Sequence, residues 1–341
     1  MFRETCNVQS YKKMHKAKQN PDAPTLADIK AARKRIKPYI LKTPLMRSET
    51  LSRELDTNVY LKLEILQKTG AFKVRGAFNK ALSLPRTMQK CGLVAVSGGN
   101  HGQAVAFAAT ALGRRSRIFM PETTPPNYLN ATRGYGAEVI LGSSIADSFR
   151  QMEAYHDQDW VALHPFDDFD IIAGQGTLGL EVHEQLPEVS DVFISIGGGG
   201  LIGGSSIALK ALNKKTRIWG VETEGANCMA EALKAGKVVQ MPSMTSIAVT
   251  LGPPAASERT FSLAQKYLEG VTVVPDSEAF AALQFLLERS KVLVEPAGSC
   301  TLAALRRQRK NFTKKSHVVL VLCGGNVSLA DVCRWRTQFG T

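Results

Sequence analysis

The sequence predicts an α/β protein with two lobes, each built on a parallel, twisted sheet covered by helices. Short runs rich in valine and isoleucine alternate with helical patterns along most of the chain, which is typical of parallel strands joined by crossover helices. The 341 residues exceed what one small core needs. We expect a disordered or loosely attached leader over 1–24, a large domain over 25–86 and 166–341, and a small domain over 87–165.

The composition is that of an ordinary soluble protein. Hydrophobic residues make up 44% and charged residues 21% of the chain, and apolar runs such as 318–322 are far too short to span a bilayer. No apolar segment follows the basic residues near the N-terminus, so no signal peptide is expected. The six cysteines are scattered without a C-x-x-C pair, which favours a reducing compartment and argues against a zinc site. We expect a cytoplasmic protein with no membrane partner.

The formal net charge is +13, a value that a nucleic-acid-binding module would also show. The lysines and arginines are spread along the chain without interleaved aromatic residues. A solvated surface that attracts small anions explains this distribution better, so we expect no nucleic-acid partner.

The first half of the chain alternates between helical and strand patterns. Thr25, with Asp28 in the first turn, predicts the start of a helix that ends before Pro38. Alternation over 59–64 predicts a strand that leads into the lysine-containing stretch 68–77. Further strands are expected over 92–96, 117–120, 138–141 and 160–164, and helices over 48–55, 76–84, 102–112, 127–135 and 145–155.

The second half continues this alternation. The segment 241–254 is rich in proline and glycine and lacks periodicity, which predicts a long loop near the functional site. Strands are expected over 192–196, 217–222, 271–274 and 318–322, and helices over 174–185, 201–212, 277–288 and 296–307.

Lys73 lies between Phe72 and Val74, just before a predicted helix. Apolar neighbours desolvate an amine and lower its pKa, which makes it nucleophilic near neutral pH. A lysine that forms a Schiff base needs this property. The alternative is a surface lysine with its charged end in water.

A run of four glycines over 197–200 lies between a predicted strand and a predicted helix. At such a place, free backbone N–H groups and the helix dipole bind phosphate, and glycine lets the backbone approach the anion closely. The alternative is a flexible link, which the flanking strand and helix disfavour.

The same glycines allow a second interpretation. Gly198, Gly200 and Gly203 satisfy the G-x-G-x-x-G pattern, and Glu222 ends the next predicted strand. This is the dinucleotide fingerprint with its acidic ribose ligand, and it would indicate an NAD-dependent dehydrogenase. It leaves Lys73 unexplained.

The turn over 97–101 places short polar side chains and free N–H groups after a predicted strand. Such a turn binds an anion, for example a substrate carboxylate. The alternative is simple capping of the next helix by Ser97 or Asn100.

Together, these motifs resemble the fold-type II pyridoxal-phosphate enzymes, which share the fold of the tryptophan synthase β chain. Within them, the chain is most similar to the serine/threonine dehydratase (ammonia-lyase) and serine racemase group. The resemblance extends from about Thr43 to Leu329. The matching segments are 72–77, 97–102, 173–177, 197–201, 294–296 and 323–326.

The resemblance implies pyridoxal 5'-phosphate as cofactor and assigns roles to individual residues. Lys73 would bond the cofactor covalently, Asn100 would contact the ring hydroxyl, and Cys323 would face the ring nitrogen. The cofactor-binding residues implied are Phe72, Lys73, Asn100, Gly197, Gly198, Gly199, Gly200, Leu201, Glu295, Cys323 and Gly324. The substrate carboxylate would be received by Ser97, Gly98, Asn100 and His101.

The reaction implied is β-elimination from a hydroxy amino acid, L-threonine and/or L-serine, which yields a 2-oxo acid and ammonia. Lys73 would take the Cα proton, and the β-hydroxyl would leave with help from the cofactor phosphate. The alternative for this chain within the group is a dehydratase for phenylserine or 3-hydroxyaspartate, or a serine racemase. The resemblance also implies a small-molecule amino-acid substrate and a homo-oligomer, a dimer.

Three positions depart from the group's pattern. Ala71 stands where the family usually has serine, which bears on substrate choice. Gly98 stands where related racemases carry a serine, so a base on the opposite face is missing and little racemisation is expected. Some relatives bind a divalent cation at the positions of Glu222, Ala226 and Cys228, but a thiol suits a hard cation poorly. We expect no metal.

Four residues keep a second interpretation. The thiol of Cys323 is only a weak donor, which favours prompt loss of a leaving group, but a small buried cysteine is also common. Glu295 would orient the cofactor ring or cap the helix that begins at Pro296. His101 would bind substrate or brace its turn, and Phe166 would make the pocket more apolar.

Overall fold

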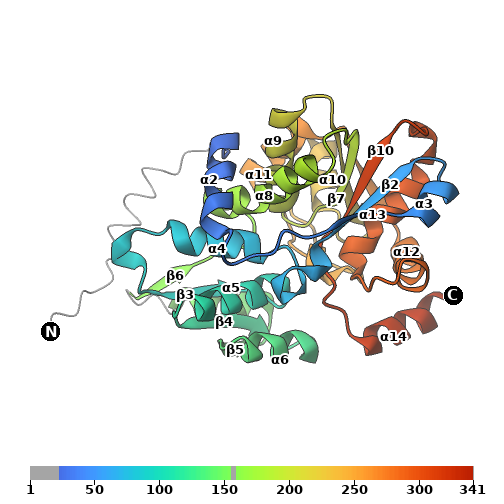
Figure 1. The fold of residues 1–341 in the computed structure, drawn as a ribbon. Coiled ribbons are helices and arrows are strands. Elements are labelled where there is room, and N and C mark those ends of the chain that lie inside the picture. The colour runs from blue at the N-terminus through green and yellow to red at the C-terminus, as the bar shows by residue number, and fades with distance from the viewer. Residues whose placement is uncertain (1–22, 155–158, 341) are drawn as a thin grey trace.

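The computed structural model describes residues 23–154 and 159–340, so the expected leader lies almost entirely outside the described residues. Two sheets organise this part of the chain: a six-stranded sheet of order β1-β2-β10-β7-β8-β9 and a four-stranded sheet of order β5-β4-β3-β6 (Figure 1). Every strand pair is parallel except the edge pair of β1 and β2. The predicted α/β fold with parallel sheets is confirmed.

The six-stranded sheet forms the core of the larger lobe. Its strands are β1 (Leu45–Arg47), β2 (Asn58–Leu63), β7 (Asp191–Ser195), β8 (Arg217–Thr223), β9 (Gly270–Val274) and β10 (His317–Leu322). Its helices are α2 (Leu26–Ile36), α3 (Glu49–Glu54), α8 (Phe169–Gln185), α9 (Gly200–Leu212), α10 (Cys228–Ala235), α11 (Glu258–Tyr267), α12 (Asp276–Arg289), α13 (Pro296–Arg307) and α14 (Leu329–Phe339). Helix α13 contacts β7 to β10, α12 packs on α13, and α8 packs on α9.

The four-stranded sheet has its own hydrophobic core. Its strands are β3 (Gly92–Val96), β4 (Ser116–Pro121), β5 (Glu138–Gly142) and β6 (Trp160–Ala162), with helices α4 (Val74–Ser83), α5 (Asn100–Ala111), α6 (Pro126–Gly134) and α7 (Ile145–Ala154). Val74, Ala77 and Phe78 of α4 belong to this core although they precede the small domain in sequence. The domain boundaries stay a prediction.

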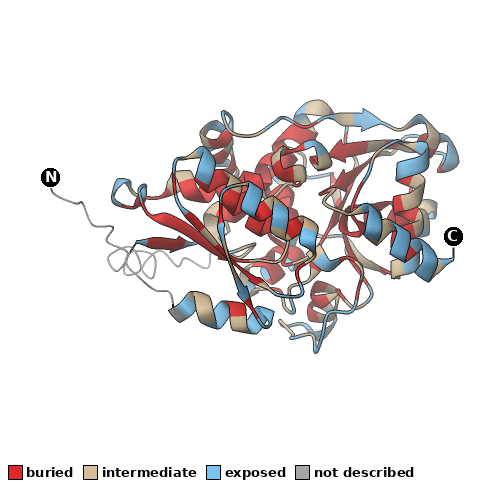
Figure 2. Cartoon of the chain, turned by 90° about the horizontal axis from the view of Figure 1, so that it is seen from below, coloured by how far each residue is buried: buried red, intermediate tan, exposed pale blue. Residues whose placement is uncertain are grey.

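Local chemistry accounts for many element boundaries. Thr25 and Asp28 form the predicted capping box at the start of α2. Helix α8 begins at Phe169, earlier than expected, because the Asp168 side chain caps it by accepting from the N–H groups of Asp170 and Ile171. The central strands of both sheets are buried, the edge strands β1, β5 and β9 are partly exposed, and the outer helices expose one face (Figure 2).

Four elements were not anticipated: β1, α10, α11 and α14. Helix α11 follows a capping box formed by Ser257 and Thr260, a signal that could have been read from the sequence. The expected loop 241–254 contains only the 3-10 turn Val249–Leu251. No helix in 23–154 or 159–340 combines the length and apolar character needed to cross a membrane.

Candidate active site

The turn that carries Lys73 is tied to the end of β10. The N–H of Phe72 donates to the carbonyl oxygen of Cys323 at 3.0 Å, and Ala71 and Gly324 form an isolated antiparallel bridge. Lys73 then immediately precedes α4. Two motifs separated by most of the sequence are therefore brought into contact at the carboxyl end of a central strand, where α/β sheets bind their ligands.

The amine of Lys73 lies in an environment that disfavours its charge. Its Nζ donates to the carbonyl oxygen of Pro165 at 2.8 Å and lies 5.1 Å from the centre of the Phe72 ring. Burial lowers the pKa of Lys73 to about 8, and nearby Cys323 and Glu295 raise it only in part. The shift has the direction that the apolar neighbours predict.

The glycine run connects β7 to α9 in the geometry of an anion site. Gly199 has φ of 88°, a left-handed conformation that side chains rarely adopt. A Cβ on Gly198 would lie 2.1 Å from the Phe166 ring, so only glycine fits there. The first N–H groups of α9 have no intrahelical partner and point outward from its N-terminus. This arrangement suits a phosphate.

One short segment connects the lysine to the glycine run. Pro165 accepts from Lys73, and the ring of Phe166 covers Gly198. Arg259 of α11 holds the segment through an ion pair of 2.7 Å with Asp167. The amine and the candidate phosphate site therefore border the same space, and Phe166 adds an apolar wall as the sequence suggests.

The turn 97–101 follows β3 and is compact. The Ser97 hydroxyl accepts from the N–H of Gly99 at 3.2 Å, and α5 begins at Asn100 rather than at residue 102 as expected. His101 is buried and its Nε2 donates to the carbonyl oxygen of Leu163 at 2.9 Å. Burial lowers the pKa of His101 to about 3, so the ring is neutral. These contacts support the bracing role for His101.

Glu295 faces the site instead of capping α13. Its side chain makes no capping hydrogen bond, although it precedes the helix. Asn100 Nδ2 donates to Glu295 Oε1 at 2.9 Å, and a Cβ on Gly324 would lie 2.7 Å from that oxygen. Burial raises the pKa of Glu295 to about 7. The capping interpretation is therefore wrong.

Cys323 is buried at the end of β10. Its sulfur lies 3.4 Å from the hydroxyl oxygen of Ser195, which donates to it. Burial raises the pKa of Cys323 to about 12, so the group is a neutral thiol at physiological pH. It offers a weak donor toward the space beside Lys73.

Glu222 has a structural role. Both of its carboxylate oxygens accept backbone N–H groups at the start of α10, from Met229 at 2.9 Å and Ala230 at 2.8 Å. It is fully buried, so a ribose could not reach it, which argues against the dinucleotide interpretation. Ala226 only closes the preceding turn. Within the described residues, no cluster of three His, Cys, Asp or Glu side chains is arranged to hold a metal.

Three residues near Glu295 were missed in the sequence: Tyr128, Thr250 and Asn326. Asn326 belongs to the matched segment 323–326, so it could have been found. Tyr128 comes from the first turn of α6 and Thr250 from the long loop, and neither position carries a local signal.

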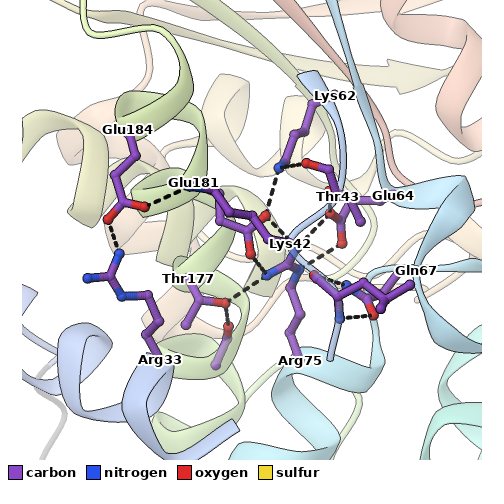
Figure 3. Close-up of polar contacts among 12 residues, drawn as sticks. Arg33, Lys42, Thr43, Lys62, Glu64, Gln67, Arg75, Thr177, Glu181 and Glu184 are labelled. Carbon is purple, nitrogen blue, oxygen red and sulfur yellow. Dashed lines mark hydrogen bonds and ion pairs between the residues drawn. The ribbon is translucent and has the colours of Figure 1, made fainter. Parts of the chain in front are cut away.

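A buried ion cluster lies beneath the lysine turn and was also missed (Figure 3). We call Lys62, Glu64, Arg75 and Glu181 the Arg75 cluster. Arg75 pairs with Glu64 through two hydrogen bonds of 2.7 Å and with Glu181 through bonds of 2.7 and 2.9 Å. Lys62 donates to Glu181 at 2.7 Å. Two positive and two negative charges thus join β2, α4 and α8 just after Lys73.

Comparison with known proteins agrees with this geometry. Residues 36–324 match the model of a family described as pyridoxal-phosphate dependent enzyme. The chain is 40% identical over 306 residues to an L-threonine ammonia-lyase of Geobacter sulfurreducens, covering 89% of this chain and 76% of the relative. It is 38% identical over 313 residues to a catabolic L-threonine dehydratase of Staphylococcus aureus, covering 90% of each.

Solved structures show the same fold. Maize serine racemase superposes with a TM-score of 0.87 at 32% identity, covering 94% of this chain and 98% of that one. A processed threonine deaminase of Solanum lycopersicum superposes with a TM-score of 0.87 at 30% identity, covering 93% and 92%. With an amine of lowered pKa beside a glycine-lined anion site, the residues present fit a phosphate-bearing aldehyde. The chain belongs to the family of pyridoxal-phosphate dependent enzymes.

Proposed function

We propose that this protein is an ammonia-lyase that converts a small hydroxy amino acid, L-threonine and/or L-serine, to a 2-oxo acid and ammonia. The observation that carries the proposal is the segment 165–166, which contacts both Lys73 and Gly198. A single ligand can therefore meet the amine through its aldehyde and the glycine run through its phosphate. The relatives named L-threonine ammonia-lyase and L-threonine dehydratase, at 40% and 38% identity, support this choice of reaction.

The cofactor site would be formed at the carboxyl ends of strands from both sheets. The N–H groups of 197–201 would hold the phosphate, and Lys73 would bond the aldehyde carbon. Asn100 would donate to the ring hydroxyl, and Cys323 would face the ring nitrogen. Phe72 and Gly324 would form walls beside the ring. When bound, pyridoxal phosphate supplies an electron sink for the negative charge that develops at the substrate Cα.

Lys73 would also move the proton. An amine with a pKa of about 8 is roughly one tenth neutral at pH 7 and half neutral at pH 8, far more than an ordinary lysine, so it can take the Cα proton. The carbonyl oxygen of Pro165 orients it through a hydrogen bond of 2.8 Å. The turn formed by Ser97, Gly98, Asn100 and His101 would hold the substrate carboxylate with N–H groups and short polar side chains. Because Gly98 has no side chain to act as a second base, elimination is favoured over racemisation.

A substrate panel tests the proposal. Holoenzyme is incubated with L-threonine, L-serine, phenylserine, 3-hydroxyaspartate and D-serine, and ammonia and oxo acid are measured together. Equal release of both products from L-threonine or L-serine supports the proposal. Turnover confined to phenylserine or 3-hydroxyaspartate, or interconversion of serine enantiomers without ammonia, contradicts it. The expected homo-oligomeric state, a dimer, stays a prediction. Size-exclusion chromatography with light scattering would test it.

The rate of cofactor capture is expected to depend on the protonation of Lys73. Only the neutral amine attacks the aldehyde, and the pKa of Lys73 is lowered to about 8. Capture by apoenzyme should therefore accelerate as pH rises from 6 and level off above about 9. Stopped-flow absorbance of the visible cofactor band measures this rate. A rate that is independent of pH across this range would contradict the assigned amine.

Gly198→Ala is expected to weaken cofactor binding about 10- to 100-fold, because its Cβ would lie 2.1 Å from the Phe166 ring and force the covering segment away. Gly134→Ala is the matched control, since a Cβ at Gly134 has no heavy atom within 4 Å. Equilibrium titration of both apoenzymes with pyridoxal phosphate gives the two dissociation constants. Equal constants would show that the glycine run is only a flexible link.

A further inference from the structure

A closed ring of polar contacts lies between the two sheets, and we call it the Glu295 ring. Its members are Glu295, Asn100, Asn326 and Tyr128. Asn100 Nδ2 donates to Glu295 Oε1 at 2.9 Å, and Asn326 Nδ2 donates to Asn100 Oδ1 at 2.8 Å. The Tyr128 hydroxyl donates to the backbone carbonyl oxygen of Asn326 and lies 3.5 Å from Glu295 Oε2. Glu295, Asn100 and Tyr128 are buried, at 3%, 5% and 4% exposure.

The donors in this ring are unequally distributed over the two oxygens of Glu295. Oε1 accepts from Asn100 and also from the Thr250 hydroxyl, at 2.9 and 3.0 Å. Among the described residues, the hydrogen-bond partner of Oε2 is the Tyr128 hydroxyl. That hydroxyl has one hydrogen, and the carbonyl oxygen of Asn326 is the nearer of its two acceptors, so we assign the hydrogen to that carbonyl.

An ionised Oε2 would therefore face a lone pair of the Tyr128 hydroxyl oxygen. Two acceptors without a hydrogen between them repel each other, and a buried charge that lacks a donor is costly. A proton on Oε2 removes the conflict, because the carboxyl can then donate to the oxygen of Tyr128.

We propose that Glu295 is protonated on Oε2 and donates to the hydroxyl oxygen of Tyr128, which makes Tyr128 a positioning residue that keeps this carboxyl neutral. The order of hydrogen bonds is then Glu295 to Tyr128 to the carbonyl oxygen of Asn326. The Tyr128 hydroxyl hydrogen and the proton on Oε2 then each have an acceptor. The rise in the pKa of Glu295 on burial to about 7 is consistent with this state.

A neutral Glu295 matters for the proposed function, on which this consequence rests. The titratable groups that sense Glu295 are Lys73, Cys323 and Cys300, and Asp331 adds its charge near Tyr128. An ionised Glu295 would raise the pKa of Lys73 and leave less of the neutral amine. Tyr128 of α6 thus tunes the proposed base, Lys73, through Glu295.

Infrared spectroscopy of the holoenzyme tests the proton directly. A protonated carboxyl has a C=O band that vanishes on ionisation, and Glu295→Gln assigns that band by removing it. Tyr128→Phe deletes the acceptor of the proton, so the pH at which the band is half lost should fall by about one unit. Thr250→Val is the matched control, because it deletes a donor to Oε1 and should raise this pH by about one unit.

Opposite shifts in the two variants support the proposal. It is overturned if Tyr128→Phe raises the midpoint or leaves it unchanged, or if wild-type enzyme shows no band assignable to Glu295 below pH 6. These readouts depend on the carboxyl and not on which amino acid is the substrate.

Discussion

Lys73→Ala is expected to lower kcat by about 10⁴-fold and to abolish the visible band of the covalently bound cofactor. The substitution removes the amine that attacks the aldehyde and the same amine that takes the Cα proton. The contacts with Phe72 and Pro165 place this amine beside the glycine run. Ammonia release and the absorption spectrum are measured on the same preparation.

The matched control for this variant is Lys68→Ala. Lys68 lies in the same turn, but its amine is 5.9 Å above the ring of Phe107 on α5 and forms no part of the site. It should retain the visible band and at least about half of the activity, since this half-buried side chain faces Phe107 and not the proposed cofactor. If Lys73→Ala kept a covalent cofactor and wild-type turnover, the proposed chemistry would be wrong.

Arg75→Met is expected to lower the free energy of unfolding by about 3–5 kcal/mol. Arg75 has no exposed surface and satisfies both Glu64 and Glu181 (Figure 3). Its removal leaves two buried carboxylates and one positive charge, that of Lys62, to balance them. A buried charge that has lost its partner destabilises the folded state strongly. Urea denaturation of the holoenzyme, followed by circular dichroism, measures the change.

Arg307→Ala provides the comparison. Arg307 also pairs with a glutamate in a close hydrogen-bonded geometry, but its side chain is 43% exposed and that of Glu278 is 42% exposed. Solvent screens this pair, so the expected loss is below about 1 kcal/mol. If both variants lost the same small amount, the Arg75 cluster would not stabilise the lysine turn.

The local patterns predicted the part of the site that is built from strand–turn–helix units. The strand before Lys73, the glycine run between β7 and α9, and the turn 97–101 could each be recognised because their backbone chemistry depends on adjacent residues. The parallel arrangement followed from the alternation of strands and helices. Helix α11, in contrast, was missed although Ser257 and Thr260 form its capping box.

The roles of the acidic residues could not be predicted in this way. Glu222 lies near the end of β8, and Glu295 directly precedes α13. The sequence allowed two interpretations of each. In the structure Glu222 caps α10 through two backbone N–H groups, whereas Glu295 turns away from α13 toward Asn100. The role of a carboxylate depends on which groups donate hydrogen bonds to it. Here the positions of those donors are defined only when the two lobes pack together.

By itself, the sequence determined the fold class and the family and indicated the amine that we propose as the base, because all three depend on short segments of contiguous residues. The tertiary structure alone decided which carboxyl groups pair with cations, which accept N–H groups at the start of a helix, and which we infer to be neutral. The physical reason is that protonation depends on burial and on hydrogen-bond partners, and the contact between Tyr128 and Glu295 joins residues 167 positions apart.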